Sequence, residues 1–234
     1  MSIADNIALV QERIAAAAVR AGRRSDEITL MAVSKTFPPS AIQQAYSAGL
    51  RTFGENRVQE FASKAEAVRD LASAQWHLIG HLQTNKAAKA AELFHSIDSV
   101  DSVRLADKLN VAAEKMKKKL QVLIEINVGA EQAKSGAVAD SPDLEELLRS
   151  AERFQYLEFM GLMTIPPFTG DPEGARPYFK NLRCLRDQIA ARNLPSISMD
   201  VLSMGMSHDF EIAIKEGSTQ VRVGTAIFGE RTKH

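Results

Sequence analysis

One lysine lies where an apolar segment stops. Lys35 follows the run from Leu30 to Val33 and Ser34, and the pair Pro38-Pro39 comes shortly afterwards. An apolar run bounded by prolines predicts a buried strand that ends at this lysine. An amine drawn into the mouth of an apolar barrel loses solvation, which favours its neutral and nucleophilic form. Lys35 is therefore a candidate for covalent chemistry with a carbonyl group, provided that the chain builds such a mouth.

Two segments rich in small residues could bind a phosphate. Residues 202–207 (Leu-Ser-Met-Gly-Met-Ser) follow one expected strand, and Gly224 and Thr225 follow the next. Exposed backbone N–H groups, the hydroxyls of Ser207 and Thr225 and the positive end of a helix together favour an anion. Taken singly, each segment favours a tight turn that needs glycine. On adjacent strands, where barrels most often hold a phosphate, the two together favour a phosphate site.

An arginine interrupts the last expected strand. Arg222 lies between Val221 and Val223, and the alternation of a strand turns it to the face opposite both valines, into a barrel interior. A buried arginine needs a partner, which is either a structural carboxylate or a ligand atom; on its own, the carboxylate is the simpler explanation. A lysine, a phosphate site and an arginine around one barrel mouth point to pyridoxal 5′-phosphate. The lysine would form a Schiff base with its aldehyde, and the two turns would bind its phosphate.

Two other site types fit the sequence less well. Residues 205–209 (Gly-Met-Ser-His-Asp) end in Asp where a nucleophile elbow has Gly, and neighbouring residues cannot form a triad among themselves, so we expect no serine hydrolase. His77 and His81 are four residues apart but lack cysteine or carboxylate partners at ligand spacing, so we expect no metal site.

Strands and helices alternate along the chain. A helix through Ile3, Ile7, Val10 and Ile14 comes first, and Gly22 is its expected C-cap. We then expect strands ending at 35 and spanning 51–54, 75–80, 93–97, 120–128, 157–163, 197–202 and 219–223. The helices that follow are expected at 39–48, up to about 71, and at 86–91, 102–118, 142–154, 173–191 and 208–215.

This alternation predicts a single (β/α)8 TIM barrel over residues 1–234, with an extra N-terminal helix. An open doubly wound sheet is the alternative, but the chain lacks the Gly-x-Gly-x-x-Gly turn that would favour it. Because the loops after barrel strands carry function, the expected site positions are Lys35, residues 55–57, His81, Asp98, Asn127, Met163, residues 203–209, and Gly224 with Thr225.

Composition excludes several classes of partner. Lys plus Arg and Asp plus Glu number 29 each, so the net charge of zero lacks the basic footprint of a nucleic-acid binder. Cys184 is the single cysteine, which rules out an intrachain disulfide, and we expect it to be buried in a helix. We find no signal-peptide pattern and no segment of transmembrane length, so we expect a cytoplasmic protein that does not bind membranes.

Five segments together resemble the pyridoxal phosphate homeostasis proteins (the YggS/PROSC type), which are similar to the barrel domain of alanine racemase. The resemblance spans almost the whole chain, and its motifs are residues 32–36 (AVSKT), 53–57 (FGENR), 76–86 (WHLIGHLQTNK), 202–207 (LSMGMS) and 221–229 (VRVGTAIFG).

The resemblance implies a fold type III barrel without the second β domain of the racemases, with pyridoxal phosphate as cofactor. It implies that Lys35 carries the Schiff base, that Ser207, Gly224 and Thr225 hold the phosphate, and that Arg222 faces the pyridine nitrogen. An arginine there keeps that nitrogen unprotonated and weakens the ring as an electron sink. Other positions in the matching segments that we expect to contact the cofactor are Asn56, His81 and Met204. Many relatives carry a basic residue two positions after the lysine, where this chain has Phe37.

The implied role is control of the free cofactor and of amino-acid and keto-acid balance, without robust catalysis. A racemase needs two bases on opposite faces of its substrate. Lys35 could supply one, but Tyr46, Tyr156 and Tyr178 lie away from the expected strand ends, and we expect no additional domain. A low-activity amino-acid racemase remains the alternative.

Two loops leave their roles open. Lys134, in the loop after the fifth strand, is either a solvated lysine or a relay that passes cofactor from Lys35 to recipient apo-enzymes. Residues 165–172 form a proline-rich loop that is either a lid or a fixed rim. We further expect a monomer.

Overall fold

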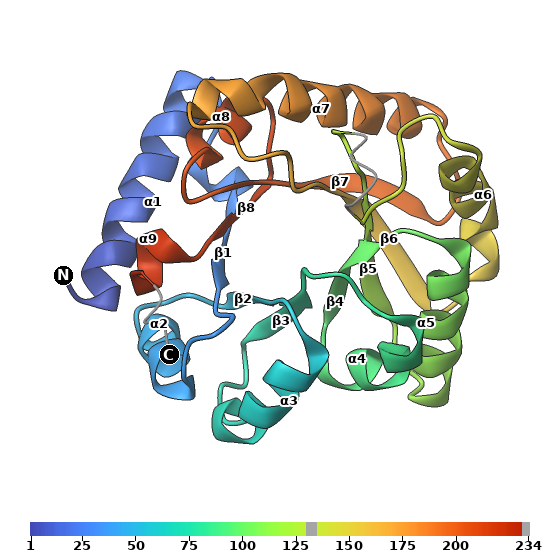
Figure 1. Ribbon diagram of the computed structural model, residues 1–234, viewed down its shortest axis with the longest axis horizontal. Helices are drawn as coiled ribbons and strands as arrows, with labels where there is room; N and C mark the ends of the chain where they lie inside the picture. The colour runs from blue at the N-terminus through green and yellow to red at the C-terminus, as the bar shows by residue number, and fades with distance from the viewer. Residues whose placement is uncertain (130–134, 231–234) are drawn as a thin grey trace.

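Eight parallel strands form the centre of the molecule. The structure is a computed structural model that describes residues 1–129 and 135–230. In these residues the strands are β1 (Thr29–Val33), β2 (Thr52–Glu55), β3 (Gln75–Leu78), β4 (Ser96–Val100), β5 (Leu120–Glu125), β6 (Leu157–Met163), β7 (Ile197–Met206) and β8 (Gln220–Val223). Each strand pairs in parallel with the next, and β1 pairs with β8, so the sheet closes into a barrel. The predicted TIM barrel is confirmed (Figure 1).

Helices surround this barrel and alternate with the strands (Figure 1). Over the described residues they are α1 (Ile3–Arg20), α2 (Pro39–Ser47), α3 (Val58–Ala65), α4 (Ala87–Leu93), α5 (Val103–Lys115), α6 (Pro142–Ser150), α7 (Arg176–Ala191), α8 (Phe210–Lys215) and α9 (Thr225–Phe228). Short 3₁₀ turns complete some connections: η1 (Ser25–Glu27), η2 (Glu66–Val68), η3 (Thr84–Lys86), η4 (Ala151–Arg153) and η5 (Pro172–Ala175).

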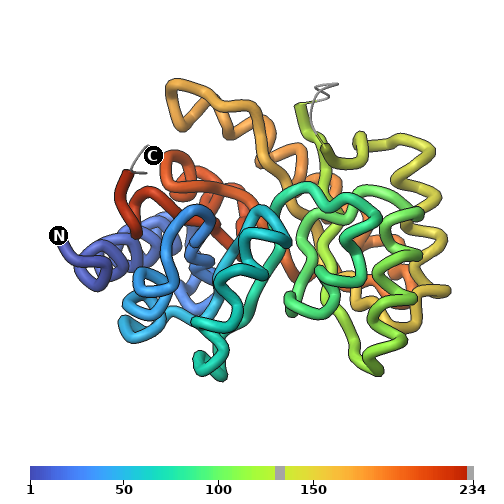
Figure 2. The backbone as a smooth tube through the Cα atoms, turned by 60° about the horizontal axis from the view of Figure 1, so that its bottom comes forward, coloured from blue at the N-terminus to red at the C-terminus, as the bar shows by residue number. Residues whose placement is uncertain are grey.

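The expected extra N-terminal helix is α1. Ser2 and Asp5 form its capping box, with the Ser2 hydroxyl accepting from the Asp5 N–H at 3.1 Å. Its apolar face is buried against α8 and α9, and the Asn6 amide donates to the Ile227 carbonyl at 2.9 Å. Figure 2 shows the red C-terminal elements returning beside this blue helix, so the last strand closes the ring next to the first.

A cluster of aromatic rings attaches α3 and α4 to the barrel wall. The Trp76 ring lies 5.1 Å from that of Phe53 and 4.6 Å from that of Phe61, whose ring is 5.0 Å from that of Phe94. Burying such large rings contributes several kcal/mol, about 1.5–3 for each side chain. Helix α3 is therefore held firmly against β2 and β3.

Three expectations differ from the structure. The fourth strand begins at Ser96, because Leu93 still belongs to α4, and Asp98 consequently lies inside the strand. The seventh strand continues to Met206, beyond the expected end at residue 202. Cys184 is exposed, because the buried face of α7 consists of Phe179, Leu182, Leu185 and Ile189. In the described part of the chain, no helix has the length and apolar character needed to cross a membrane.

Candidate functional site

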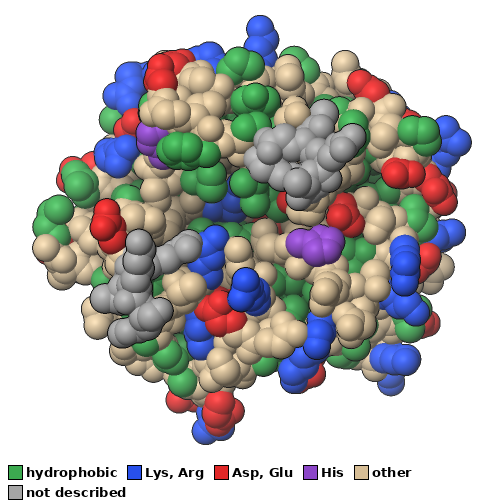
Figure 3. Space-filling model, viewed as in Figure 1, with side chains coloured by type: hydrophobic (Ala, Val, Ile, Leu, Met, Phe, Trp, Pro, Cys, Tyr) green, Lys and Arg blue, Asp and Glu red, His purple; other side chains and the backbone are tan. Residues whose placement is uncertain are grey.

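The loops after the strands enclose a cavity of about 410 Å³. Its wall combines apolar side chains with amine, guanidinium, carboxyl, imidazole and hydroxyl groups. Figure 3 shows a hollow in the middle of this face of the molecule, with Lys and Arg side chains in and around it. The lining residues are Val33, Lys35, Phe37, Asn56, Ile79, Gly80, His81, Glu125, Ser135, Ile165, Phe168, Met206, Ser207, His208, Arg222, Gly224 and Thr225.

Lys35 lies two residues beyond the end of β1, whereas the expected strand ran to the lysine itself. The Ser34 N–H donates to the Gly54 carbonyl at 2.9 Å, which extends the ladder with β2 by one residue. Thr36 has a φ of 68°, and the Phe37 N–H closes the turn on the Ser34 carbonyl at 3.1 Å. The turn therefore ends the strand sharply and leaves Lys35 on the wall of the cavity.

Phe37, two residues after the lysine, packs against the last helix. Its ring stacks on that of Phe228 in α9, with centroids 4.8 Å apart. This contact joins the loop after β1 to the helix after β8. Phe37 thus forms an apolar part of the cavity wall next to the lysine.

The two small-residue segments meet as the sequence predicted. The N–H groups of Gly224 and Ala226 point to one atom, the Ser207 Oγ, at 3.3 and 3.4 Å. A side chain at position 224 would place its Cβ 3.3 Å from the Val33 carbonyl oxygen, so glycine permits the close approach of β8 to β1. Converging N–H groups beside a hydroxyl form a concave site suited to an anion.

Arg222 points into the barrel and is only 2% exposed. It donates to the Ser203 hydroxyl at 2.8 Å and to the Thr164 carbonyl at 2.6 Å. Both acceptors are neutral oxygens, so the carboxylate expected as its structural partner does not bond it directly. Burial lowers the pKa of Arg222, while the charges of Asp98 and Asp209 oppose that shift, and the guanidinium stays protonated.

A buried polar layer lies beneath the arginine. Asp98 accepts a hydrogen bond from Gln220 at 3.2 Å and from the Ser96 hydroxyl at 2.6 Å, and His77 Nδ1 lies 3.1 Å from both of its oxygens. Burial raises the pKa of Asp98, but His77, Ser96 and Arg222 outweigh burial, so the pKa is lowered. Asp98, expected at a strand end, is therefore an interior structural carboxylate below the cavity.

Glu125 is a cavity residue that the sequence did not single out as a site. It is 4% exposed, and the Ser135 hydroxyl donates to its Oε1 at 3.1 Å. Its Oε2 is buried and has no hydrogen-bond partner among the residues that the structure describes. Burial raises the pKa of this carboxyl, and the charge of Asp101 adds to that shift. One signal was visible in the sequence. A carboxylate in an otherwise apolar strand costs folding free energy unless it is paired, so its presence there can indicate a functional residue.

Seven of the eight predicted binding residues line the cavity. His81 is at the rim, with a side chain 57% exposed and Nδ1 3.8 Å from Asp101. Met204 is fully buried in the core, and Met206 lines the cavity in its place. Met163, another expected position, is also buried away from it.

Four further expectations concern the surroundings. Ile165 and Phe168 of the proline-rich loop line the cavity, and the Phe168 ring contacts His208 at 5.6 Å. None of the three tyrosines lines it. Lys134 lies outside the described residues. Within those residues, no cluster of three His, Cys, Asp or Glu side chains could hold a metal ion.

Comparison with known proteins identifies the class of this barrel. Residues 3–232 match the family model described as alanine racemase, N-terminal domain. The chain is also 45% identical to the pyridoxal phosphate homeostasis protein of Aquifex aeolicus (strain VF5), over 99% of both chains. It is 43% identical to the protein of the same name from Escherichia coli (strain K12), over 98% of this chain and 97% of that one. The chain therefore belongs to the pyridoxal phosphate homeostasis protein family.

A solved structure supports the same assignment. PipY of Synechococcus elongatus PCC7942, determined with PLP bound, is 35% identical to this chain and aligns with a TM-score of 0.83. The alignment covers 97% of this chain and all of PipY (100%). The family that the sequence motifs resembled is thus confirmed over nearly the full length.

Proposed function

We propose that this protein binds pyridoxal 5′-phosphate as a Schiff base on Lys35 and acts in intracellular vitamin B6 homeostasis and amino-acid and keto-acid balance. One observation carries the proposal. The amine-bearing turn after β1 and the turn residues Ser207, Gly224 and Thr225 line a single cavity of about 410 Å³. Homologues carry the homeostasis name, and PipY was solved with PLP bound.

The residues present fit this cofactor by their chemistry. The turn residues Ser207, Gly224 and Thr225 offer the N–H and hydroxyl donors that a phosphate group needs. Arg222 offers guanidinium donors to the pyridine nitrogen, since its two hydrogen bonds to protein use only part of its five N–H groups. The unpartnered Glu125 Oε2 is an orphaned buried polar atom that a ligand donor could satisfy.

When bound, the cofactor supplies an aldehyde that reacts with primary amines. The Lys35 amine, in its neutral form, would attack the aldehyde carbon; a C=N bond forms and the carbonyl oxygen leaves as water. Phe37 and Ile79 would keep water away from that bond. Ser207 and Arg222 would fix the two ends of the ring system.

The test is an absorbance spectrum of the purified protein with added pyridoxal phosphate. We expect a Schiff-base band in the wild type that is absent from Lys35→Ala, and borohydride should fix one cofactor mass to the peptide containing Lys35. A wild type without the band would refute cofactor binding and favour a barrel that binds only proteins.

A racemase of low activity is the second candidate, favoured by the relationship to the alanine racemase N-terminal domain. Racemisation requires a second base opposite Lys35, and no tyrosine lines the cavity. We therefore propose negligible racemase activity. Loss of α-proton chirality in several amino acids is the assay, and turnover at enzymic rates would contradict this proposal.

Delivery of the cofactor is a separate proposal. The recipients would be pyridoxal-phosphate-dependent apo-enzymes, with Lys134 as a possible relay or a solvated residue. Unchanged transfer from Lys134→Ala to an apo-enzyme would dispose of the relay. We also propose a monomer, tested by sedimentation, located in the cytoplasm, tested by fractionation.

A further inference from the structure

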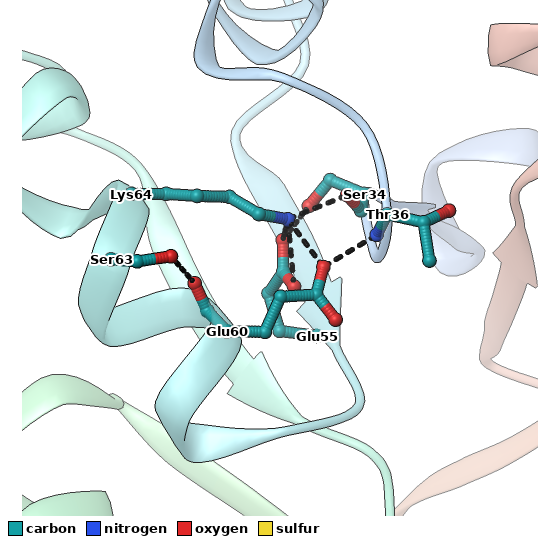
Figure 4. A network of polar contacts seen from close by, with 6 residues as sticks. All are labelled: Ser34, Thr36, Glu55, Glu60, Ser63 and Lys64. Carbon is teal, nitrogen blue, oxygen red and sulfur yellow. Dashed lines mark hydrogen bonds and ion pairs between the residues drawn. The ribbon is translucent and has the colours of Figure 1, made fainter. Parts of the chain in front are cut away.

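The residues on both sides of Lys35 are held by charged side chains from β2 and α3 (Figure 4). Lys64 donates to the Ser34 carbonyl at 3.2 Å, and the Ser34 hydroxyl donates to Glu55 Oε1 at 2.8 Å. On the other side, the Thr36 N–H donates to Glu60 Oε1 at 2.5 Å. The backbone is thus bonded immediately before and immediately after the lysine.

These three charged residues form one connected group. Lys64 Nζ lies 3.2 Å from Glu55 Oε1 and 2.8 Å from Glu60 Oε1. The Glu55 side chain is fully buried and that of Lys64 is 10% exposed, whereas that of Glu60 is 25% exposed. Buried charges of this kind are costly unless each is paired and hydrogen-bonded, which makes the geometry of the group well defined.

The turn has a conformation that needs such support. Thr36 is β-branched, and its φ of 68° lies in the left-handed region that such residues rarely adopt. The bond from its N–H to Glu60 holds it there. The aromatic cluster packs α3 against the barrel through Phe61. The backbone that carries Glu60 and Lys64 is therefore held in place.

The group stands apart from the cavity. Glu55, Glu60 and Lys64 do not line it, whereas Lys35 does. The group therefore contacts the turn that carries the lysine and does not itself form part of the cavity wall.

We propose that Glu60 and Lys64 are positioning residues: with Glu55, they clamp the backbone on both sides of Lys35 and so aim its amine into the cavity. The inference rests on the proposed function only in taking Lys35 as the attachment point. Its ligand class is an aldehyde that reacts with the aimed amine. Without the clamp the amine would sample more directions, and attachment would become less favourable.

The first arm of the test uses cofactor-free protein. Amide hydrogen exchange of Thr36, followed by NMR, should be several-fold faster in Glu60→Ala than in the wild type. Glu66→Ala is the matched control, since it removes a carboxylate of η2, just after α3, whose side chain is 80% exposed and pairs with Arg69. Unchanged exchange at Thr36 in Glu60→Ala would overturn the clamp, whether or not the cofactor binds.

The second arm measures pyridoxal phosphate affinity and the pH dependence of the Schiff-base absorbance. We expect Glu60→Ala to raise the Kd about tenfold and to shift the pH profile, with Glu66→Ala matching the wild type. Glu60→Gln keeps an acceptor for the Thr36 N–H but loses the ion pair with Lys64, so its Kd should rise about threefold. A general loss of stability would lower Tm without moving the pH profile.

The outcomes separate the two proposals. A wild type that does not bind the cofactor refutes the proposed function and leaves the exchange arm to judge the clamp. A wild type that binds, beside a Glu60→Ala variant with the same Kd and pH profile, refutes the clamp alone. If Glu60→Ala does not fold, Glu60→Gln replaces it in the binding arm: about threefold weaker binding at unchanged Tm supports the clamp, and wild-type binding overturns it.

Discussion

Replacing Glu125 with Gln should stabilise the cofactor-free protein at neutral pH. The wild-type carboxyl is 4% exposed, and its Oε2 has no hydrogen-bond partner. Burial raises its pKa, and the Ser135 hydroxyl and the charges of Arg222 and His81 offset that shift only in part. The ionised side chain is therefore poorly compensated in the folded protein.

The sign of the pH dependence follows from the raised pKa. A carboxyl whose pKa is higher in the folded state contributes stability that is complete below its unfolded value, near 4.5, and is lost as the pH rises through the folded value. At pH 7 a buried, unsatisfied polar group costs about 1–3 kcal/mol. Gln is neutral throughout, so Glu125→Gln should be more stable by about 1 kcal/mol at pH 7 and equal to the wild type near pH 4.

Urea unfolding of both proteins between pH 4 and pH 8 is the assay, because the difference between them cancels every other titrating group. Glu158→Gln is the control, since Glu158 is an exposed residue of the neighbouring strand β6. A Glu125→Gln variant that is less stable at pH 7, or a difference that does not change with pH, would refute the reasoning.

Three further substitutions test the site and its support. Gly80→Ala places a Cβ 2.3 Å from the Asn56 carbonyl oxygen, so the cavity wall must shift, and titration should give at least tenfold weaker pyridoxal phosphate binding. Asp98→Asn should lower the free energy of unfolding by about 1–3 kcal/mol at pH 7, because the carboxylate that accepts from Ser96 and Gln220 is lost. The lowered pKa of Asp98 makes this difference shrink as the pH falls through it, which urea unfolding measures. Ser207→Ala should weaken pyridoxal phosphate about tenfold and leave the phosphate-free pyridoxal unchanged, as measured by absorbance titration.

The barrel was predictable because its signals are local. Apolar runs of strand length alternate with helical periodicity, and this pattern alone fixes the type of each element. The boundaries of β4 and β7 were not predictable in the same way. Leu93 and Phe94 would fit a helix or a strand equally well. The strand begins at Ser96, where Ser96 and Gln220 donate to the buried Asp98.

The site residues at strand ends could be predicted from the sequence, but those inside β7 could not. Lys35, Ser207 and Gly224 stand at strand ends, which the sequence shows directly. Met204 does not line the cavity, whereas Met206 does, and the reason is structural. The pairing of β7 with β8 shifts register between Ser203 and Met206, so simple alternation no longer tells which side chain faces the cavity.

The clamp around Lys35 was invisible for a different reason. Glu60 and Lys64 are separated from Ser34 and Thr36 by more than twenty residues, and charged residues at helical spacing normally indicate a solvated face. Only packing of α3 on the barrel turns that face inward. Long-range pairing of this kind leaves no periodic trace in a single sequence.

The arrangement around Lys35 argues for holding a cofactor more than for turning over a substrate. Proton transfer on two faces needs two suitably placed bases, and Lys35 lies on the cavity wall next to a hydrogen-bonded turn. Of its other titratable groups, His81 lies at the exposed rim, 57% exposed. Arg222 stays charged and is bonded to protein oxygens. A site with one amine, a buried cation and an anion-binding turn is suited to retaining an aldehyde phosphate, and none of the three tyrosines lines it.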